Sequence, residues 1–472
     1  MTAAIPSYTR TLGAWIAASG SLELPPDVIA IAKLLTLDTL GCGLLASQLP
    51  WTRRLLETVR DIEAPGPALV WGHADRFSPA STAMINGTAV QGFELDDVGP
   101  GSHFGSVTVT VALALAGSRP VSGSQFLRAV VTGIETGSRI SEGVGREPHV
   151  GNGFHGPGLF GTFAAAATAA SLLGLDEEQS THTLSTAAQF AGGLMATHHG
   201  GMGKRLLAGK AAHSGTLAAQ LSSHGFTNID NVFECGYGSF SLAFTGGRGP
   251  ADLSLLTDGL GESYRTRAEK FKRWACRAPI HPALDAVTSM RAERDFTAAE
   301  VEEVEVQLPW GSFKAVGFPY QPAGVATAQL NLQYCLAAML LEGQVFVAQF
   351  DEHRLASPDI LDLVSRIRVT HAPALDDPSL GPKPRDTIVR IALADGQVLE
   401  RRSGAGLLPA RDETAAVIVP AKFKSITANV IDAGTQAAIA DCCTRLDQAA
   451  DVAELTGLLE VPPRRVTVPA PG

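Results

Sequence analysis

The segment around which the rest of the chain is organised reads Gly200-Gly-Met-Gly-Lys-Arg-Leu-Leu-Ala-Gly-Lys-Ala-Ala-His-Ser-Gly215. Its glycines and alanines allow close approach of neighbouring backbones, so the segment predicts a helix packed tightly among other helices. Lys204 lies where the glycine-rich loop turns into this helix, and the segment holds no acidic residue to neutralise it. An ammonium there is a compact point charge suited to a carboxylate, although a solvated surface lysine is the alternative.

Helical periodicity extends on both sides of this segment. Spaced apolar residues bounded by Gly, Pro or polar turns predict helices at 27–45, 80–95, 107–116, 124–144, 159–173, 176–194 and 204–224. After about residue 268 the apolar residues alternate, which predicts strands at 301–308, 366–370, 387–393 and 397–401. The Asp395-Gly396 pair between the last two strands indicates a hairpin. A helix at 326–341 lies among these strands, and helical patterning returns from 420 to 459.

The order of these elements predicts a mainly α protein with two lobes. A chain of 472 residues exceeds one ordinary core, so a large all-helical domain with an inserted smaller α+β domain is expected. We place the first part of the helical domain at 1–267, the α+β domain at 268–405, and a C-terminal helical segment that returns to the helical domain at 406–472. Two lobes imply a cleft between them.

Composition restricts the classes of partner. The net charge of −10 disfavours nucleic acid and anionic membranes, which both require a basic protein surface. The alanine-rich run at 162–175 is shorter than the ~20 apolar residues that span a bilayer. The beginning of the chain lacks a basic region followed by an apolar core, so a cytoplasmic location is expected. The six cysteines show no CxxC spacing, which favours reduced thiols over a zinc site.

An acidic segment follows the helix predicted at 80–95. Glu94, Asp96 and Asp97 come at the carboxyl end of that helix, where the helix dipole disfavours negative charge, so a functional role is a reasonable interpretation. Glu94 and Asp97 are three residues apart and are expected to share a helix face, from which a carboxylate could orient the imidazole of His103. The alternative is that Asp96-Asp97 forms an ordinary capping turn.

Two further polar segments could contribute to a site. His155 lies among glycines at the start of the helix predicted at 159–173, where a helix N-terminus favours an anion; the alternative is a histidine that only completes a turn. Lys272, Arg277 and His281 lie where the helical body gives way to the α+β domain. They would face the cleft if that domain closes over it, and the alternative is a basic surface linker.

Motifs for a cofactor, a metal or a covalent nucleophile are not found in the sequence. The chain has no Walker loop and no G-x-S-x-G elbow, and the G-x-G-x-x-G wording of 151–156 does not follow a strand. His198-His199 lacks the spacing of known metal sites. Histidines, carboxylates and cations without such motifs suit removal of a proton beside a carboxylate, with the enolate held by positive charge.

Four segments in this order resemble the MmgE/PrpD family, which includes 2-methylcitrate dehydratase, cis-aconitate decarboxylase and iminodisuccinate epimerase. The resemblance covers nearly the whole chain, from the helix at Pro25 to the tail. It is carried by Phe93-Glu-Leu-Asp-Asp97 with His103, Gly153-Phe-His-Gly-Pro-Gly158, Gly201-Met-Gly-Lys-Arg205 with Ala211-Ala-His-Ser-Gly215, and Phe271-Lys272 through His281-Pro-Ala.

The resemblance implies a helical domain, an α+β lid domain, a homodimer, and no cofactor or metal. By position it implies that His103 is the general acid or base, that His155 is its partner in the pocket, and that Lys204 and Lys272 receive substrate carboxylates. It also suggests Tyr320 as the lid tyrosine.

Two departures from the family pattern affect the remaining candidates. The family often has Asp where this chain has Glu94, and commonly Asp-Asp-Thr where this chain has Asp97-Val98. Arg277 lies where the decarboxylases of animals have a further histidine. Glu94 and Asp97 are kept as catalytic candidates, and Arg277 and His281 as candidates for substrate binding.

The first functional interpretation is a lyase of the 2-methylcitrate dehydratase type, acting on a small di- or tricarboxylate. A cis-aconitate decarboxylase is a close alternative, because the Glu-Leu-Asp-Asp wording and the Gly-Gly-Met-x-Lys-Arg segment are closer to fungal enzymes of that kind. An epimerase of an iminodisuccinate-like acid would need two proton transfers, which His103 and His155 could supply. A non-catalytic family member is the fourth alternative, because a fold does not guarantee a function.

Overall fold

The computed structural model describes residues 7–145, 151–199, 201–377, 379, 386–404 and 406–460. The side chains of His198 and His199 lie outside the described part of the chain, so the metal interpretation considered for them lies there too. The chain divides into two compact units. A helical unit comprises 1–197, 202–271 and 409–472, and an α+β unit comprises 198–201 and 272–408. The breaks expected from the sequence fall after residues 267 and 405.

The mainly α architecture predicted from the sequence is confirmed. The helical unit contains helices α1 (Tyr8–Ala18), α2 (Pro26–Ala46), α3 (Pro50–Ile62), α4 (Pro79–Gln91), α5 (Gly105–Ala116), α6 (Gly123–Val144), α8 (Gly156–Leu173), α9 (Glu177–Phe190), α10 (Gly203–Ser223), α11 (Phe240–Phe244), α18 (Ala415–Thr427), α19 (Ala433–Thr444) and α20 (Ala453–Leu458). A small hairpin of β1 (Ala68–Leu69) and β2 (Arg76–Phe77) joins α3 to α4. Strands β3 (Lys270–Phe271) and β8 (Leu408–Pro409) lie where the chain leaves and re-enters this unit.

Two of the predicted helices end earlier than expected. The helix expected at 80–95 stops at Gln91, and the helix expected at 176–194 stops at Phe190. After α4 the apolar pattern continues into the following loop, because loop side chains such as Phe93 and Leu95 are also buried; after α9 the pattern ends on Leu194, whose side chain is 57% exposed. Burial of a loop therefore imitates helical periodicity in the sequence.

Helix α10 packs closely against α4 and α8, as the small residues of its sequence predict. A Cβ atom on Gly209 would lie 2.2 Å from the carbonyl oxygen of Met84 in α4, and one on Gly87 would lie 3.1 Å from the Gly209 Cα. Only glycine fits at such a crossing. The crossing holds the first turn of α10, which carries Lys204, near the loop that follows α4.

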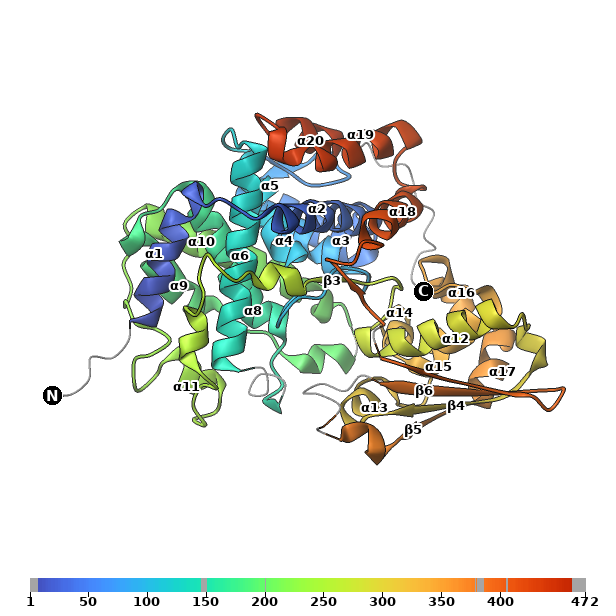
Figure 1. Cartoon of the computed structure of the whole chain (residues 1–472). Helices are drawn as coiled ribbons and strands as arrows, with labels where there is room; N and C mark the ends of the chain where they lie inside the picture. The colour runs from blue at the N-terminus through green and yellow to red at the C-terminus, as the bar shows by residue number, and fades with distance from the viewer. Residues whose placement is uncertain are drawn as a thin grey trace. The chain divides into compact units, whose positions relative to one another are not determined.

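The C-terminal segment returns to the helical unit, as expected. Helix α18, drawn in red, lies beside α2, drawn in blue, although almost the whole chain separates them (Figure 1). The apolar side chains of this seam include Phe423 and Ile426, and a Cβ atom on Gly41 of α2 would lie 3.0 Å from the Phe423 ring and 3.2 Å from the Ile426 side chain. The last part of the sequence thus completes the core begun by the first.

The α+β unit is built on a four-stranded sheet in the order β5-β4-β6-β7. Its strands are β4 (Val301–Leu308), β5 (Ile367–His371), β6 (Thr387–Leu393) and β7 (Val398–Ser403). Strand β4 pairs with β5 in parallel and with β6 antiparallel, and β6 and β7 form the predicted hairpin. The helices of the unit are α12 (His281–Glu293), α13 (Trp310–Val316), α14 (Val325–Gln329), α15 (Leu332–Glu342), α16 (Glu352–Leu355) and α17 (Pro358–Arg366).

The helix expected at 326–341 is two helices. Helix α14 ends at Gln329, and Asn331 then caps α15 by accepting a hydrogen bond from the backbone N–H of Tyr334 at 2.9 Å. The asparagine side chain offers the backbone a partner outside the helix, which explains the interruption.

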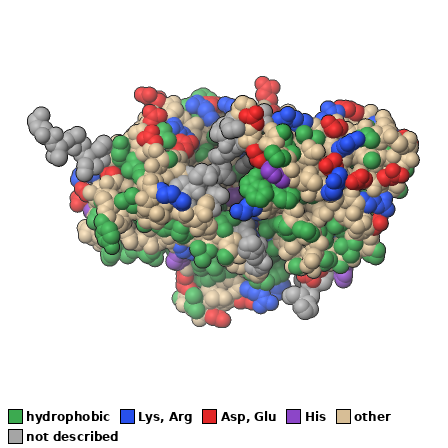
Figure 2. Space-filling model, turned by 90° about the horizontal axis from the view of Figure 1, so that it is seen from below, with side chains coloured by type: hydrophobic (Ala, Val, Ile, Leu, Met, Phe, Trp, Pro, Cys, Tyr) green, Lys and Arg blue, Asp and Glu red, His purple; other side chains and the backbone are tan. Residues whose placement is uncertain are grey.

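Two helices of the helical unit, α2 and α8, are long and apolar enough to cross a bilayer by length and composition. In the folded unit, 72% of the apolar window of α2 and 89% of that of α8 are buried, as in core helices of globular proteins. The face drawn in Figure 2 mixes acidic, basic and hydrophobic side chains, which fits the balance of 37 Lys and Arg against 47 Asp and Glu.

Candidate active site

The acidic segment after α4 is a loop rather than part of a helix. Helix α4 ends at Gln91, so Glu94 and Asp97 do not share a helix face, and that expectation was wrong. Glu94 has a φ of +56°, in the left-handed region that side chains other than glycine rarely occupy. Such backbone conformations persist where surrounding contacts hold them, and they are concentrated at functional sites.

His103 is paired with Asp96, a residue of the acidic segment that the sequence analysis did not keep among the catalytic candidates. The Asp96 Oδ2 atom lies 3.0 Å from His103 Nδ1. The Asp96 side chain is only 1% exposed, whereas the His103 side chain is 22% exposed and therefore partly accessible to solvent. A buried carboxylate on Nδ1 orients an imidazole and leaves Nε2 for proton transfer. A carboxylate therefore does orient His103, but it belongs to Asp96 and not to Glu94 or Asp97.

Lys204 forms an ion pair with Glu94 inside the protein. Both side chains are more than nine-tenths buried, and Lys204 lies in the first turn of α10. The expectation of a cation without an acidic neighbour was therefore incomplete, because the neighbour comes from the loop after α4. An ammonium carries three N–H donors, so one lysine can hold more than one carboxylate.

Arg205, the next residue, fixes the beginning of the same loop. Its guanidinium donates a hydrogen bond to the carbonyl oxygen of Gly92 and stacks 4.7 Å from the ring centroid of Trp51. Burial lowers the pKa of Arg205 to about 10, so the group stays charged at neutral pH. Helix α10 is thus joined to the loop by two successive cationic residues.

His155 precedes the first turn of α8 and is almost fully buried. Its backbone N–H donates to the carbonyl oxygen of Gly193 at 2.9 Å. In the next turn of α8, a Cβ atom on Gly161 would lie 3.2 Å from Ser102 Oγ and 3.7 Å from the Ala211 side chain. The segment that carries His103 and the helices that begin near His155 and Lys204 therefore pack together. Two long helices, α8 and α10, begin here, and helix N-termini favour anions.

Asp97 lies beside another buried carboxyl group, that of Glu269. Its Oδ1 atom accepts a hydrogen bond from the backbone N–H of Gly105 at 3.1 Å, which fixes the start of α5. Burial, with the nearby charge of Asp96, raises the pKa of Asp97 to about 7. Burial, together with the neighbouring Asp97 carboxyl group, raises the pKa of Glu269 well above its usual range. Asp97 and Glu269 are therefore two neighbouring buried carboxyl groups that disfavour each other's ionised form.

Lys272 and Arg277 belong to the α+β unit. Lys272 is buried directly after β3. The Arg277 guanidinium donates to the carbonyl oxygen of Ala315 at 2.9 Å, and burial lowers the pKa of Arg277.

His281 and Tyr320 are enclosed within the same α+β unit. The two ring nitrogens of His281 lie 3.2 Å from the carbonyl oxygen of Gly406 and 3.4 Å from that of Cys276. The Tyr320 hydroxyl donates to the carbonyl oxygen of Leu355 at 2.9 Å, and burial raises the pKa of Tyr320. The polar atoms of both side chains thus have backbone partners within their own unit.

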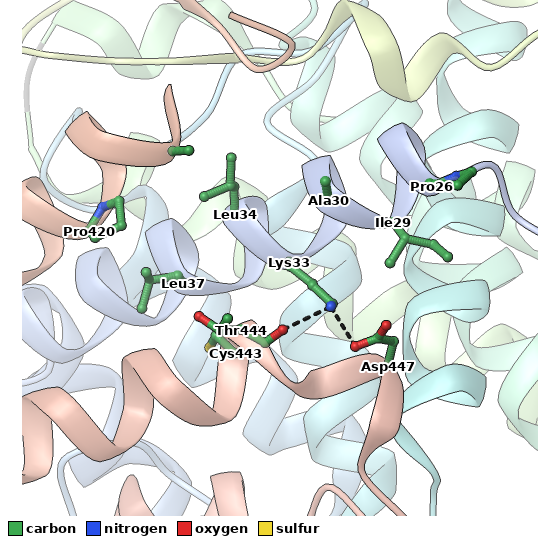
Figure 3. Close-up of a pocket in the computed structure, with 11 residues that line it drawn as sticks. Pro26, Ile29, Ala30, Lys33, Leu34, Leu37, Pro420, Cys443, Thr444 and Asp447 are labelled. Carbon is green, nitrogen blue, oxygen red and sulfur yellow. Dashed lines mark hydrogen bonds and ion pairs between the residues drawn. The ribbon is translucent and has the colours of Figure 1, made fainter. Parts of the chain in front are cut away.

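A separate pocket opens on the seam between α2 and the C-terminal helices. Its volume is about 620 Å³, and none of the predicted site residues lines it. Figure 3 shows Lys33 pointing from α2 toward the carbonyl of Thr444 and the carboxylate of Asp447. The remaining lining is mostly apolar: Pro26, Ile29, Ala30, Leu34, Leu37, Ala416, Pro420 and Cys443.

Comparison with known proteins places both parts of the chain in one family. Residues 10–251 match the MmgE/PrpD N-terminal domain, and residues 274–448 match the MmgE/PrpD C-terminal domain. A cis-aconitate decarboxylase-like protein of Aspergillus oryzae is 30% identical, with 96% of this chain and 97% of that protein aligned. A cis-aconitate decarboxylase of Aspergillus terreus is 26% identical (95% of each chain), and the human cis-aconitate decarboxylase is 27% identical (93% of this chain, 92% of that protein).

Proposed function

The chain belongs to the MmgE/PrpD family and to its lyase type, and we propose that it is a carboxy-lyase acting on cis-aconitate or a closely similar polycarboxylate. The names of the relatives favour this over the 2-methylcitrate dehydratase type, which was the first interpretation of the sequence. The observation that carries the proposal is that one loop brings together two pairs: Asp96 with His103, both in the loop, and Glu94 of the loop with Lys204 of α10.

The two pairs supply the two requirements of decarboxylation. Lys204, assisted by the N-termini of α8 and α10, provides positive charge for substrate carboxylates and for the carbanion that forms. The bond between one carboxylate carbon and the substrate chain breaks, carbon dioxide leaves, and the electron pair is delocalised into the adjacent double bond. His103, oriented by Asp96, delivers a proton to carbon and completes the reaction. His155 is proposed to bind a substrate carboxylate.

The test is incubation of the purified protein with cis-aconitate, 2-methylcitrate, citrate and iminodisuccinate in deuterated water, followed by NMR of the products. We expect release of carbon dioxide from cis-aconitate, with one deuterium on a carbon of the product. Water loss from 2-methylcitrate would support a dehydratase instead, and deuterium exchange in iminodisuccinate without loss of a group would support an epimerase. Silence on all four substrates would contradict the proposal.

The variant His103→Ala tests whether the reaction takes place at this site. If the assignment holds, this variant loses turnover while retaining the circular dichroism spectrum of the parent protein. An unchanged rate would remove His103 from the mechanism even if the parent protein releases carbon dioxide.

A further inference from the structure

Lys422, near the middle of α18, is a buried cation for which the proposed reaction has no direct use. Its side chain is 4% exposed, and its ammonium lies 2.7 Å from Asp38 Oδ1 in α2, a carboxylate that is 1% exposed. Burying a charge is costly unless the charge is paired and hydrogen-bonded. A buried lysine at this position is therefore understandable if its contacts there serve a function.

The same ammonium also holds the catalytic loop, the segment at 92–104 between α4 and α5 that carries Glu94, Asp96 and His103. Lys422 Nζ donates a hydrogen bond of 2.6 Å to the carbonyl oxygen of Leu95. Leu95 lies between Glu94, which pairs with Lys204, and Asp96, which pairs with His103. The peptide group of Leu95 therefore joins the residue that pairs with Lys204 to the residue that pairs with His103.

The electrostatic surroundings of Lys422 keep its ammonium group charged. Burial by itself would lower the pKa of Lys422, but the attraction of Asp38, joined by Cys42 and Asp96, raises it. The lysine stays charged and places a positive charge behind a loop that carries three buried carboxyl groups. Without that charge, ionised Asp38 and Asp96 would repel each other across a region of low dielectric.

We propose that Lys422 is a positioning residue of the active site, which, anchored by Asp38, fixes the Leu95 peptide and thereby the directions of Glu94 and Asp96. This assigns a functional reason to the return of the C-terminal segment to the helical unit. The proposal rests on the proposed function for its kinetic consequence, but its structural consequence is independent of the reaction.

A matched control exists on the same seam. Lys33 joins α2 to the C-terminal segment through Asp447 Oδ1 at 2.5 Å and the carbonyl oxygen of Thr444 at 2.8 Å. Within the described residues, no hydrogen bond or ion pair joins Lys33 to the loop at 92–104, and Lys33 is more exposed than Lys422. Lys33→Met therefore weakens the attachment of the C-terminal segment without removing the support of the loop.

The experiment compares Lys422→Met, the double variant Asp38→Asn/Lys422→Met, and Lys33→Met. The single variant leaves a buried carboxylate without its cation, so we expect a large fall in Tm; the double variant removes both charges and should recover much of that fall. If the single variant does not fold, the double variant decides the question. Amide hydrogen exchange of peptides spanning 92–104 and kcat and KM on cis-aconitate are the measurements.

We expect faster exchange across 92–104 and a fall in kcat of about 100-fold, with KM little changed, in the double variant. Lys33→Met should show neither effect. Unchanged exchange in the double variant, equal acceleration in Lys33→Met, or faster exchange with an unchanged kcat would each overturn the proposal. If the parent protein turns over no substrate, the proposed function fails, and the exchange result alone decides the role of Lys422.

Discussion

The buried carboxyl pair of Asp97 and Glu269 predicts an unusual dependence of stability on pH. The pKa of Asp97 is raised from 3.8 to about 7 in the folded protein, because burial and the charge of Asp96 disfavour its ionised form. An acid whose pKa is raised by folding binds more protons in the folded state, so folding stability falls as pH rises between the two values. With 1.36 kcal/mol for each pKa unit, the loss amounts to about 4 kcal/mol.

The perturbation is Asp97→Asn, which keeps the oxygen that accepts from the backbone N–H of Gly105 and removes the ionisable group. The assay is urea unfolding of parent and variant between about pH 4 and about pH 8, the window in which this group titrates. The unfolding free energy of the parent minus that of Asp97→Asn should fall by about 4 kcal/mol across the window and then stay level.

Asp75 provides a control of opposite sign. Its pKa is lowered, first by its hydrogen bond to Arg60, so its contribution to stability is present above 3.8 and is lost as pH falls below that value. The same difference for Asp75→Asn should therefore be level across the window. A difference for Asp97→Asn that stays level or increases with pH would refute a raised pKa for Asp97.

Three further predictions concern the site residues. Asp96→Asn should lower kcat by about 10²- to 10⁴-fold, because His103 loses the carboxylate that orients it; a change in KM alone would contradict this. Lys204→Met should lower kcat/KM for polycarboxylates by about 10- to 100-fold, the loss of one charge-assisted hydrogen bond, and an unchanged value in steady-state kinetics would refute the role of this cation. His281→Gln should lower Tm in calorimetry while KM is unchanged, because the ring is 0% exposed and bonded within its own unit; a raised KM with unchanged Tm would restore His281 as a substrate ligand.

Much of the architecture was predictable from local patterns. Helices at 107–116, 124–144 and 159–173 were found within a few residues of their positions, because continuous apolar segments with Gly or Pro at their ends carry that information locally. The hairpin at 387–401 was marked by its Asp-Gly turn. The end of α4 was missed, because the loop after it is as buried as the helix.

The importance of the acidic loop was predictable from the sequence, but the pairing of its side chains was not. Three carboxyl groups at a helix end indicated a functional segment, and His103 was recognised beside them. Which carboxylate meets which cation depends on the left-handed turn at Glu94, which sends Glu94 toward Lys204 and Asp96 toward His103. Spacing in a sequence assumes a regular backbone, and this turn is irregular.

By itself, the sequence determined the helical and strand segments, the family, and the chemical types gathered near His103, since these follow from local pattern and composition. Only the tertiary structure decided that Lys204 is paired with Glu94, that Asp97 lies beside a second buried carboxyl group, Glu269, and that Lys422 supports the loop from the far end of the chain. The reason is physical. Pairing between buried charges is set by distance and desolvation in the folded core, and neither quantity exists until segments far apart in the sequence have packed together.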